Sequence, residues 1–134
     1  MLRPETRARA RALQLLYAWE AQNRPPLAQV LGVLGAKDRR RWQSGMALAE
    51  CVTTQVGRLD AEITQSAEHW RLERLGAVER NILRLGTWEL LGEKTPPAVA
   101  IDEAVKLARW FAGPKAPGFV NGVLDALARR LGRL

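Results

Sequence analysis

Arginines open the chain and give way to an apolar segment. The chain begins with Arg3, Arg7, Arg9 and Arg11, and continues as ALQLLYAWE, which holds the only tyrosine, Tyr17. Guanidinium groups pair with phosphates, and an exposed ring offers a surface on which an unstacked base can lie. This combination is typical of proteins that hold single-stranded RNA. The alternative is a solvated helix end, although cations at a helix N-terminus oppose the helix dipole, so stability alone does not favour them there.

The whole chain is basic, which bears on the class of partner. Its 134 residues include 21 Lys or Arg against 14 Asp or Glu, a formal net charge of +7. This excess favours polyanionic partners, with RNA, DNA and anionic membrane all open, although nucleotide bias in the gene would also produce it. Two more basic runs, Arg39 to Arg41 and Arg129 to Arg133, are interpreted as solvated surface, of which some residues could join the same face.

Residues suited to catalysis are scarce. His69 and Cys51 are the only histidine and cysteine, and neither has the partners of a catalytic triad or a zinc site. The sequence GPKAPG, residues 113–118, lacks the Gly-Lys-Ser/Thr ending and the preceding strand of a phosphate-binding loop. We therefore expect no enzyme, no cofactor and no metal. A single cysteine and the lack of a long apolar run favour a cytoplasmic location.

The basic residues must be positioned by helices, because apolar residues recur with helical spacing and no segment alternates like a strand. In the first helix Ala12, Leu13, Leu15, Leu16 and Trp19 form an apolar stripe. At about 100° per residue, Arg3, Arg7, Arg11 and Gln14 fall on the opposite side. Arg9 projects near the stripe and Tyr17 lies at its border.

The remaining chain predicts five or six more helices. One runs from Leu27 to Leu34 and ends at Gly35; the next starts at Asp38 and carries an apolar face as far as Leu59. Asp60 is expected to cap the following helix, in which Trp70 points inward, and a central helix is expected over 78–90. The sequence Thr95-Pro96-Pro97 marks the start of another helix, which leads to an inward Phe111. A last helix is expected over 119–131, with Gly122 in a close helix contact. We expect an all-α fold and a single domain, residues 1–134.

Three stretches in this order resemble the NusB family of bacterial transcription antitermination factors. The first is RARARALQLLYAWE, similar to the family's arginine-rich start and "ALQ-LY" helix. The second is AVERNILRLGTWELL, residues 77–91, similar to the family's central helix. The third is PPAVAIDEAVKLARWFAGPKAPGFVNGVLDALA, residues 96–128, which carries the most specific signature, FVNGVLD.

The resemblance implies a fold of six to seven helices arranged as two packed three-helix bundles. It also implies binding of single-stranded boxA RNA from ribosomal RNA leaders together with NusE, a small-subunit ribosomal protein. The pair would act on RNA polymerase with other Nus factors and suppress premature termination during ribosomal RNA transcription. By position, the RNA-binding residues would be Arg7, Arg9, Arg11, Tyr17 and Phe119, and Glu79 would contact the RNA and NusE surface. To the RNA-binding set we add Arg3 and Gln14, which share the basic side of the first helix, and Lys115, which lies in the loop before Phe119.

One departure and two alternatives remain open at the level of sequence. Gly118 stands where the family usually has a basic residue before its Phe, so Lys115 would have to compensate. The same helical domain also precedes ribosomal RNA cytosine methyltransferases, although no SAM-binding motif or catalytic Cys motif follows here. A purely structural, partner-binding bundle without RNA contact is the third possibility. The sequence does not choose between a monomer and a homodimer.

Overall fold

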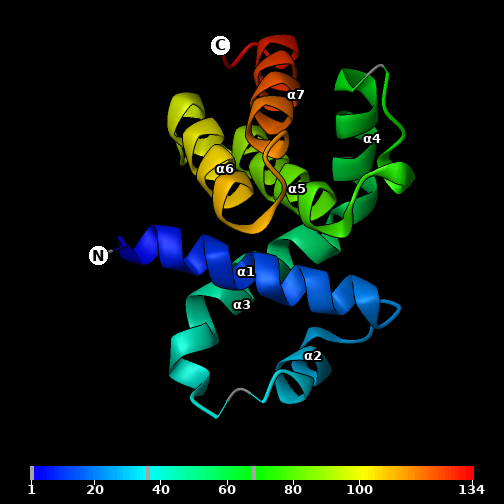
Figure 1. The fold of residues 1–134 in the computed structure, drawn as a ribbon. Helices are drawn as coiled ribbons and strands as arrows, with labels where there is room; N and C mark the ends of the chain where they lie inside the picture. The colour runs from blue at the N-terminus through cyan, green and yellow to red at the C-terminus, as the bar shows by residue number, and fades with distance from the viewer. Residues whose placement is uncertain (1, 36, 68) are drawn as a thin grey trace. The chain divides into compact units, whose positions relative to one another are not determined.

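The computed structural model describes residues 2–35, 37–67 and 69–134, and all regular structure in these ranges is helical (Figure 1). Seven α-helices and one short 3₁₀ turn make up the described elements, which confirms the all-α expectation. The chain divides into two compact units, the N-terminal unit of residues 1–54 and the C-terminal unit of residues 55–134. In the described part of the chain, no helix has both the length and the apolar character that crossing a membrane requires.

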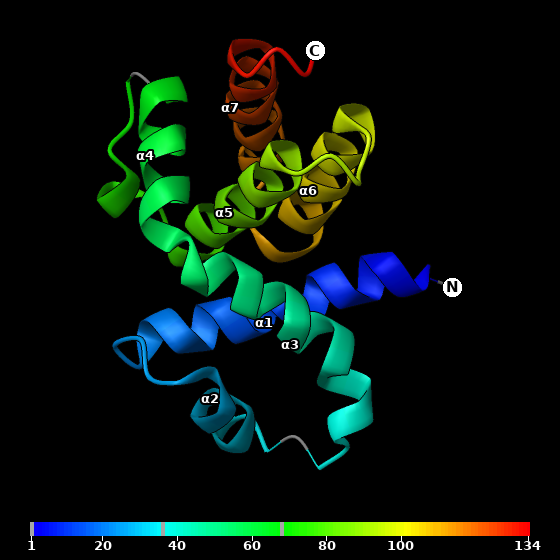
Figure 2. The same cartoon turned by 180° about the vertical axis from the view of Figure 1, so that it is seen from behind.

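The N-terminal unit contains α1 (Pro4–Ala21), α2 (Leu27–Val33) and α3 (Arg39–Thr54). The longest of these, α1, packs mainly on α3 and less extensively on α2 (Figure 2). Its apolar stripe is buried as predicted, at Ala12, Leu13, Leu15, Leu16 and Trp19. The contact with α3 is close at Gly45, where an added Cβ would lie 2.8 Å from Arg11 Cβ.

The ends of these helices follow the sequence signals. Asn23 and Arg24 adopt φ of 63° and 60°, and the Arg24 guanidinium lies 4.9 Å from the centre of the Trp19 ring. Gly35, with φ of 67°, follows α2 as predicted, since glycine adopts this left-handed conformation at little cost. Asp38 caps α3, because its Oδ1 accepts a hydrogen bond from the Arg40 backbone N–H at 3.1 Å.

The C-terminal unit contains α4 (Val56–Ser66), the 3₁₀ turn η1 (Leu72–Arg74), α5 (Ala77–Leu91), α6 (Pro97–Phe111) and α7 (Ala116–Arg130). The central helix is α5, as predicted, because it contacts α4, α6 and α7 (Figure 1). Its close approach to α7 depends on Gly86, where an added Cβ would lie 2.6 Å from Leu124 Cδ1. The N-terminal unit thus has three helices, as the resemblance implied, and the C-terminal unit has four.

The predicted role of Asp60 as a helix cap is wrong. The helix expected to run from Asp38 to Leu59 ends at Thr54, and α4 already begins at Val56, so Asp60 lies inside it. The hydroxyl of Thr54 donates to the Cys51 carbonyl oxygen at 3.1 Å, a side-chain bond that competes with helix continuation. Asp60 instead holds the buried Arg84 through two hydrogen bonds, to Nε at 2.7 Å and to Nη2 at 2.9 Å.

Three more local predictions differ from the structure. Trp70 and Phe111 were expected inward, but 57% and 43% of their surfaces are exposed. The expected close helix contact at Gly122 is absent among the described residues, since no atom lies within 4 Å of an added Cβ there. By contrast, α6 begins at Pro97, as the Thr95-Pro96-Pro97 start signal predicted, and the Thr95 hydroxyl donates to Glu89 Oε1 at 3.2 Å.

Candidate nucleic-acid interface

The α1 basic face comprises Arg3, Arg7, Arg11, Gln14 and Tyr17. Within the ranges that the structure describes, the Arg3 and Arg7 side chains are exposed and form no ion pair or hydrogen bond. Gln14 is also exposed and projects on the same side of the helix, since it follows Arg7 after about two turns. Positive charge without an internal partner is available for an external anion, so this face can bind phosphates.

Arg9 and Arg11 differ from Arg7 in their surroundings. Arg9 lies on the apolar side of α1, as its spacing predicted, and only 8% of its surface is exposed. Arg11 is half-buried, and its Nη1 donates a hydrogen bond to the backbone carbonyl oxygen of Arg41 at the start of α3. Arg11 therefore helps to hold α1 against α3, a role that its sequence position did not reveal.

Tyr17 supplies an aromatic surface at the C-terminal end of the α1 basic face. Nearly half of this residue, 49%, is exposed. A helical rise of about 1.5 Å per residue places it roughly 15 Å along the axis from Arg7. Both parts of a single-strand site are thus present on one helix, with guanidinium groups for phosphates and a ring for a base.

A second group of the predicted residues meets in the C-terminal unit. One pocket of about 510 Å³ is lined by Glu79 of α5, Lys115 just before α7, and Phe119 of α7. The same pocket includes Trp70 and Arg74, and we call these five residues with their enclosed space the aromatic pocket. The rings of Trp70 and Phe119 pack edge to face, with centres 5.3 Å apart and an interplanar angle of 73°.

Two charged side chains of the aromatic pocket differ in their exposure to solvent. Lys115 is exposed beside the N-terminus of α7. Glu79, by contrast, is half-buried, and its Oε2 lies over Gly76, so closely that a Cβ there would collide with it. Because Gly76 is the N-cap residue of α5, the carboxylate is favourably placed near the positive end of the helix dipole.

Trp70 and Arg74 are site residues that the sequence interpretation missed. Helical spacing placed Trp70 inward, but the residues around it form a loop and the turn η1 rather than a helix. The available signal was composition, since the segment from His69 to Arg74 combines an aromatic ring with two arginines. A second hollow, of about 460 Å³, shares Trp70 and Phe119 with the aromatic pocket and is also lined by His69, Gly118 and Gly122.

The described residues offer charge and ring surface with which a ligand can be bound. No three His, Cys, Asp or Glu side chains gather there as metal ligands would. His69 is exposed. Exposed guanidinium groups, a tyrosine, and a tryptophan packed on a phenylalanine match a polyanion with unstacked bases.

Comparison with known proteins points to one family over almost the entire length of the chain. Residues 6–129 match the sequence model of the NusB family. Transcription antitermination protein NusB of Solibacter usitatus is 41% identical over 129 residues, covering 93% of this chain and 88% of the relative. Because this relative is covered almost to its full length, the comparison favours an antitermination protein over the methyltransferase alternative.

Solved structures agree with this sequence match. A crystal form of NusB from T. maritima superposes with a TM-score of 0.82 at 32% identity, covering 96% of this chain and 93% of that one. A chain in the crystal structure of antitermination factors NusB and NusE in complex with double-stranded RNA superposes with a TM-score of 0.78 at 31% identity. In that case 97% of this chain and 99% of the other are covered.

Proposed function

The chain belongs to the NusB family of transcription antitermination proteins, which are not enzymes, and from this premise we propose that it binds single-stranded boxA RNA together with NusE. The pair acts on RNA polymerase, with other Nus factors, during transcription of ribosomal RNA. This role places the protein in the cytoplasm. The two units, residues 1–134 together, serve as one RNA-binding domain.

The observation that carries the proposal is the α1 basic face. Arg3 and Arg7 are exposed and have no partner among the described residues, and Tyr17 is half-exposed on the same helix. RNA phosphates neutralise the guanidinium groups and release counterions, while an unpaired base lies on the Tyr17 ring. Gln14 lies between these groups and offers both a donor and an acceptor to a base edge. Arg9 and Arg11 contribute positive charge and hold the helix in place.

The aromatic pocket supports the same function. Trp70 and Phe119 present ring surface for a second base, and Lys115 and Arg74 supply charge beside it. Lys115 thereby compensates for Gly118, which stands where the resemblance implied a basic residue. We assign Glu79, at the wall of this pocket, to the boundary between RNA and NusE.

The RNA experiment compares a double variant with a charge-matched control. Arg3→Glu combined with Arg7→Glu removes two phosphate contacts and repels the strand, so boxA affinity should fall at least tenfold at moderate salt. Arg11 is left intact because it also holds α3. Arg58→Glu with Arg109→Glu changes the charge equally at two exposed sites of the C-terminal unit and should have little effect. Fluorescence anisotropy measures binding, and circular dichroism confirms that the variants are folded.

Equal affinities of a folded Arg3→Glu, Arg7→Glu variant and the parent chain would contradict the role of this face. The solved complex that resembles this chain contains double-stranded RNA, so each titration is repeated with boxA annealed to its complement. We expect the single strand to bind more tightly, because unstacked bases are needed for ring contacts. Gel filtration with NusE, with and without RNA, tests the partner: absence of a complex in both cases would remove NusE from the proposal.

A further inference from the structure

A second cluster of arginines lies at the start of α3, where Arg39, Arg40 and Arg41 are all exposed. The nearby Asp38 carboxylate accepts a hydrogen bond from the Arg40 backbone N–H and thus serves the helix end. Three cations in the first turn of a helix face the positive end of its dipole, which is unfavourable for the helix itself. Their placement therefore calls for an anionic ligand rather than a contribution to stability.

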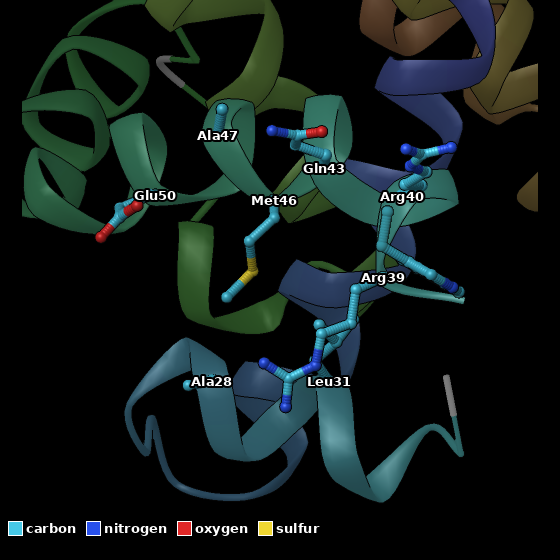
Figure 3. Close-up of a pocket in the computed structure, with 9 residues that line it drawn as sticks. Ala28, Leu31, Arg39, Arg40, Gln43, Met46, Ala47 and Glu50 are labelled. Carbon is cyan, nitrogen blue, oxygen red and sulfur yellow. The ribbon is translucent and has the colours of Figure 1, made fainter. Parts of the chain in front are cut away.

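These arginines border an open groove in the same unit. Both α2 and α3 pack on α1 but contact each other little, so a space of about 520 Å³ remains between them. Apolar side chains line it, namely Leu31 from α2 and Trp42 and Met46 from α3. Figure 3 shows Met46 directed from α3 toward α2, and Arg39 reaching across toward Leu31. We call this space, with Leu31, Arg39, Arg40, Trp42 and Met46, the α2–α3 groove.

The first turn of α3 links the groove to the α1 basic face, because it holds both Arg41 and the lining residues Arg39 and Arg40. Arg11 donates its hydrogen bond to the carbonyl oxygen of Arg41, so the last guanidinium of the α1 basic face touches the first turn of α3. Both surfaces belong to the N-terminal unit. A strand lying on Arg7 and Arg11 can thus pass to the arginines of α3 without leaving positive surface.

We propose that the α2–α3 groove binds nucleotides of the single-stranded RNA that flank the segment held by α1. Arg39 and Arg40 pair with two consecutive phosphates, and one base enters the groove against Trp42 and Met46. The amide of Gln43 and the carboxylate of Glu50, both on the lining, are available to the base edge. This assignment rests on the proposed function and extends the RNA footprint beyond the core element.

Charge and chemistry favour RNA over an acidic peptide in this groove. Residues 1–54 hold nine of the 21 basic residues but four of the 14 acidic ones, so +5 of the net +7 lies in this unit. An acidic amphipathic helix would match the arginines and apolar lining, but its carboxylates would be repelled by Glu50, whereas a base edge can donate an amino hydrogen to that carboxylate. A nucleotide uses all of these groups, since its phosphate is anionic and its base carries both donors and acceptors.

The test compares RNAs of different length. A boxA core oligonucleotide is titrated beside two longer ones that carry about four unpaired nucleotides on the 5′ or the 3′ side. One of the two longer oligonucleotides should bind roughly tenfold more tightly than the core oligonucleotide, as expected for one stacked base and two phosphates. In the Arg39→Gln, Arg40→Gln variant this gain should fall to less than twofold, while binding of the core RNA changes little. Trp42→Leu, which keeps an apolar side chain in the groove, should lose most of the gain.

The control is Arg58→Gln with Arg109→Gln, which removes the same charge elsewhere and should keep the full gain. The proposal is overturned if neither flank raises the affinity of the parent chain, or if the gain survives in the Arg39→Gln, Arg40→Gln variant. It is also overturned if an acidic amphipathic peptide, with a scrambled peptide as its reference, binds the groove and the flanked RNAs do not compete. If the core RNA does not bind, the proposed function itself is contradicted. If the core RNA binds but the flanked RNAs bind no more tightly, only the proposal for the groove is contradicted.

Discussion

Single residues of the aromatic pocket give the sharpest test of base stacking. Trp70 is 57% exposed and rests edge to face on Phe119, so its outer face is free to receive a base. Stacking of one base on an aromatic side chain is worth about 1–3 kcal/mol. Trp70→Ala should therefore weaken boxA binding about tenfold, a factor that corresponds to about 1.4 kcal/mol. Anisotropy titration at fixed salt measures the effect.

The matched control for this change is Trp110→Ala. Trp110 is 44% exposed in the same unit but does not line the aromatic pocket. Its loss should leave RNA affinity within twofold of the parent chain. If the two tryptophan variants lose affinity equally, exposed aromatic surface in general, and not the pocket, would be responsible.

At the residue scale, the sequence predicted the direction of a side chain better than its partner. Helical spacing correctly separated the exposed Arg7 from the buried Arg9, because both positions depend on α1 alone. The partner of Arg84 was not predictable in this way. That arginine is 2% exposed, and its bidentate partner Asp60 lies 24 positions earlier on another helix. Such a pair depends on how α4 meets α5, which periodicity does not encode.

The contact between α1 and α3 provides a prediction at the element scale. An added Cβ at Gly45 would lie 2.8 Å from Arg11 Cβ and 3.2 Å from two backbone atoms of α1, Ala12 N and Ala8 O. Backbone cannot move aside as a side-chain tip can, so Gly45→Ala should separate the helices. We expect the free energy of unfolding to fall by about 1–3 kcal/mol. Urea denaturation followed by circular dichroism measures the loss.

Gly122→Ala should change the free energy of unfolding in the opposite direction to Gly45→Ala. Gly122 lies inside α7 with no atom within 4 Å of an added Cβ, so alanine meets open space there. Alanine favours a helix interior over glycine by about 1 kcal/mol, and the free energy of unfolding should rise by up to that amount. A stabilising Gly45→Ala, or a strongly destabilising Gly122→Ala, would contradict the packing described for these helices.

Helix positions could be predicted from the sequence where strong end signals are present. Gly35 and the proline pair Pro96-Pro97 mark the end of α2 and the start of α6 within two residues. The division between α3 and α4 was missed, because the apolar face continues through Val56 and only threonine hydroxyls mark the end at Thr54. The aromatic pocket was also only partly predictable, since it combines residues from α5, α7 and the loop before η1, and the loop has no periodicity.

At the scale of the whole molecule, positive charge is unevenly distributed along the chain. The N-terminal unit carries +5 in 54 residues, and the C-terminal unit carries +2 in 80. Arg84 and Arg130 of the C-terminal unit are further occupied by ion pairs with Asp60 and Glu62, whereas Arg3 and Arg7 have no such partner in the described residues. Electrostatic attraction of RNA should therefore depend mainly on the N-terminal unit.

This uneven charge predicts the salt dependence of binding. Three or four phosphate contacts by the core RNA give a slope of about −2 to −3 for log K against log salt, because each contact on a single strand contributes about −0.7. Arg3→Gln with Arg7→Gln removes two contacts, so the slope should become shallower by about 1.4. Arg58→Gln with Arg109→Gln removes the same net charge without removing a contact and should leave the slope unchanged. Titrations between roughly 50 and 300 mM salt measure it. Equal shallowing by both pairs would mean that net charge, and not the α1 basic face, determines how this protein holds RNA.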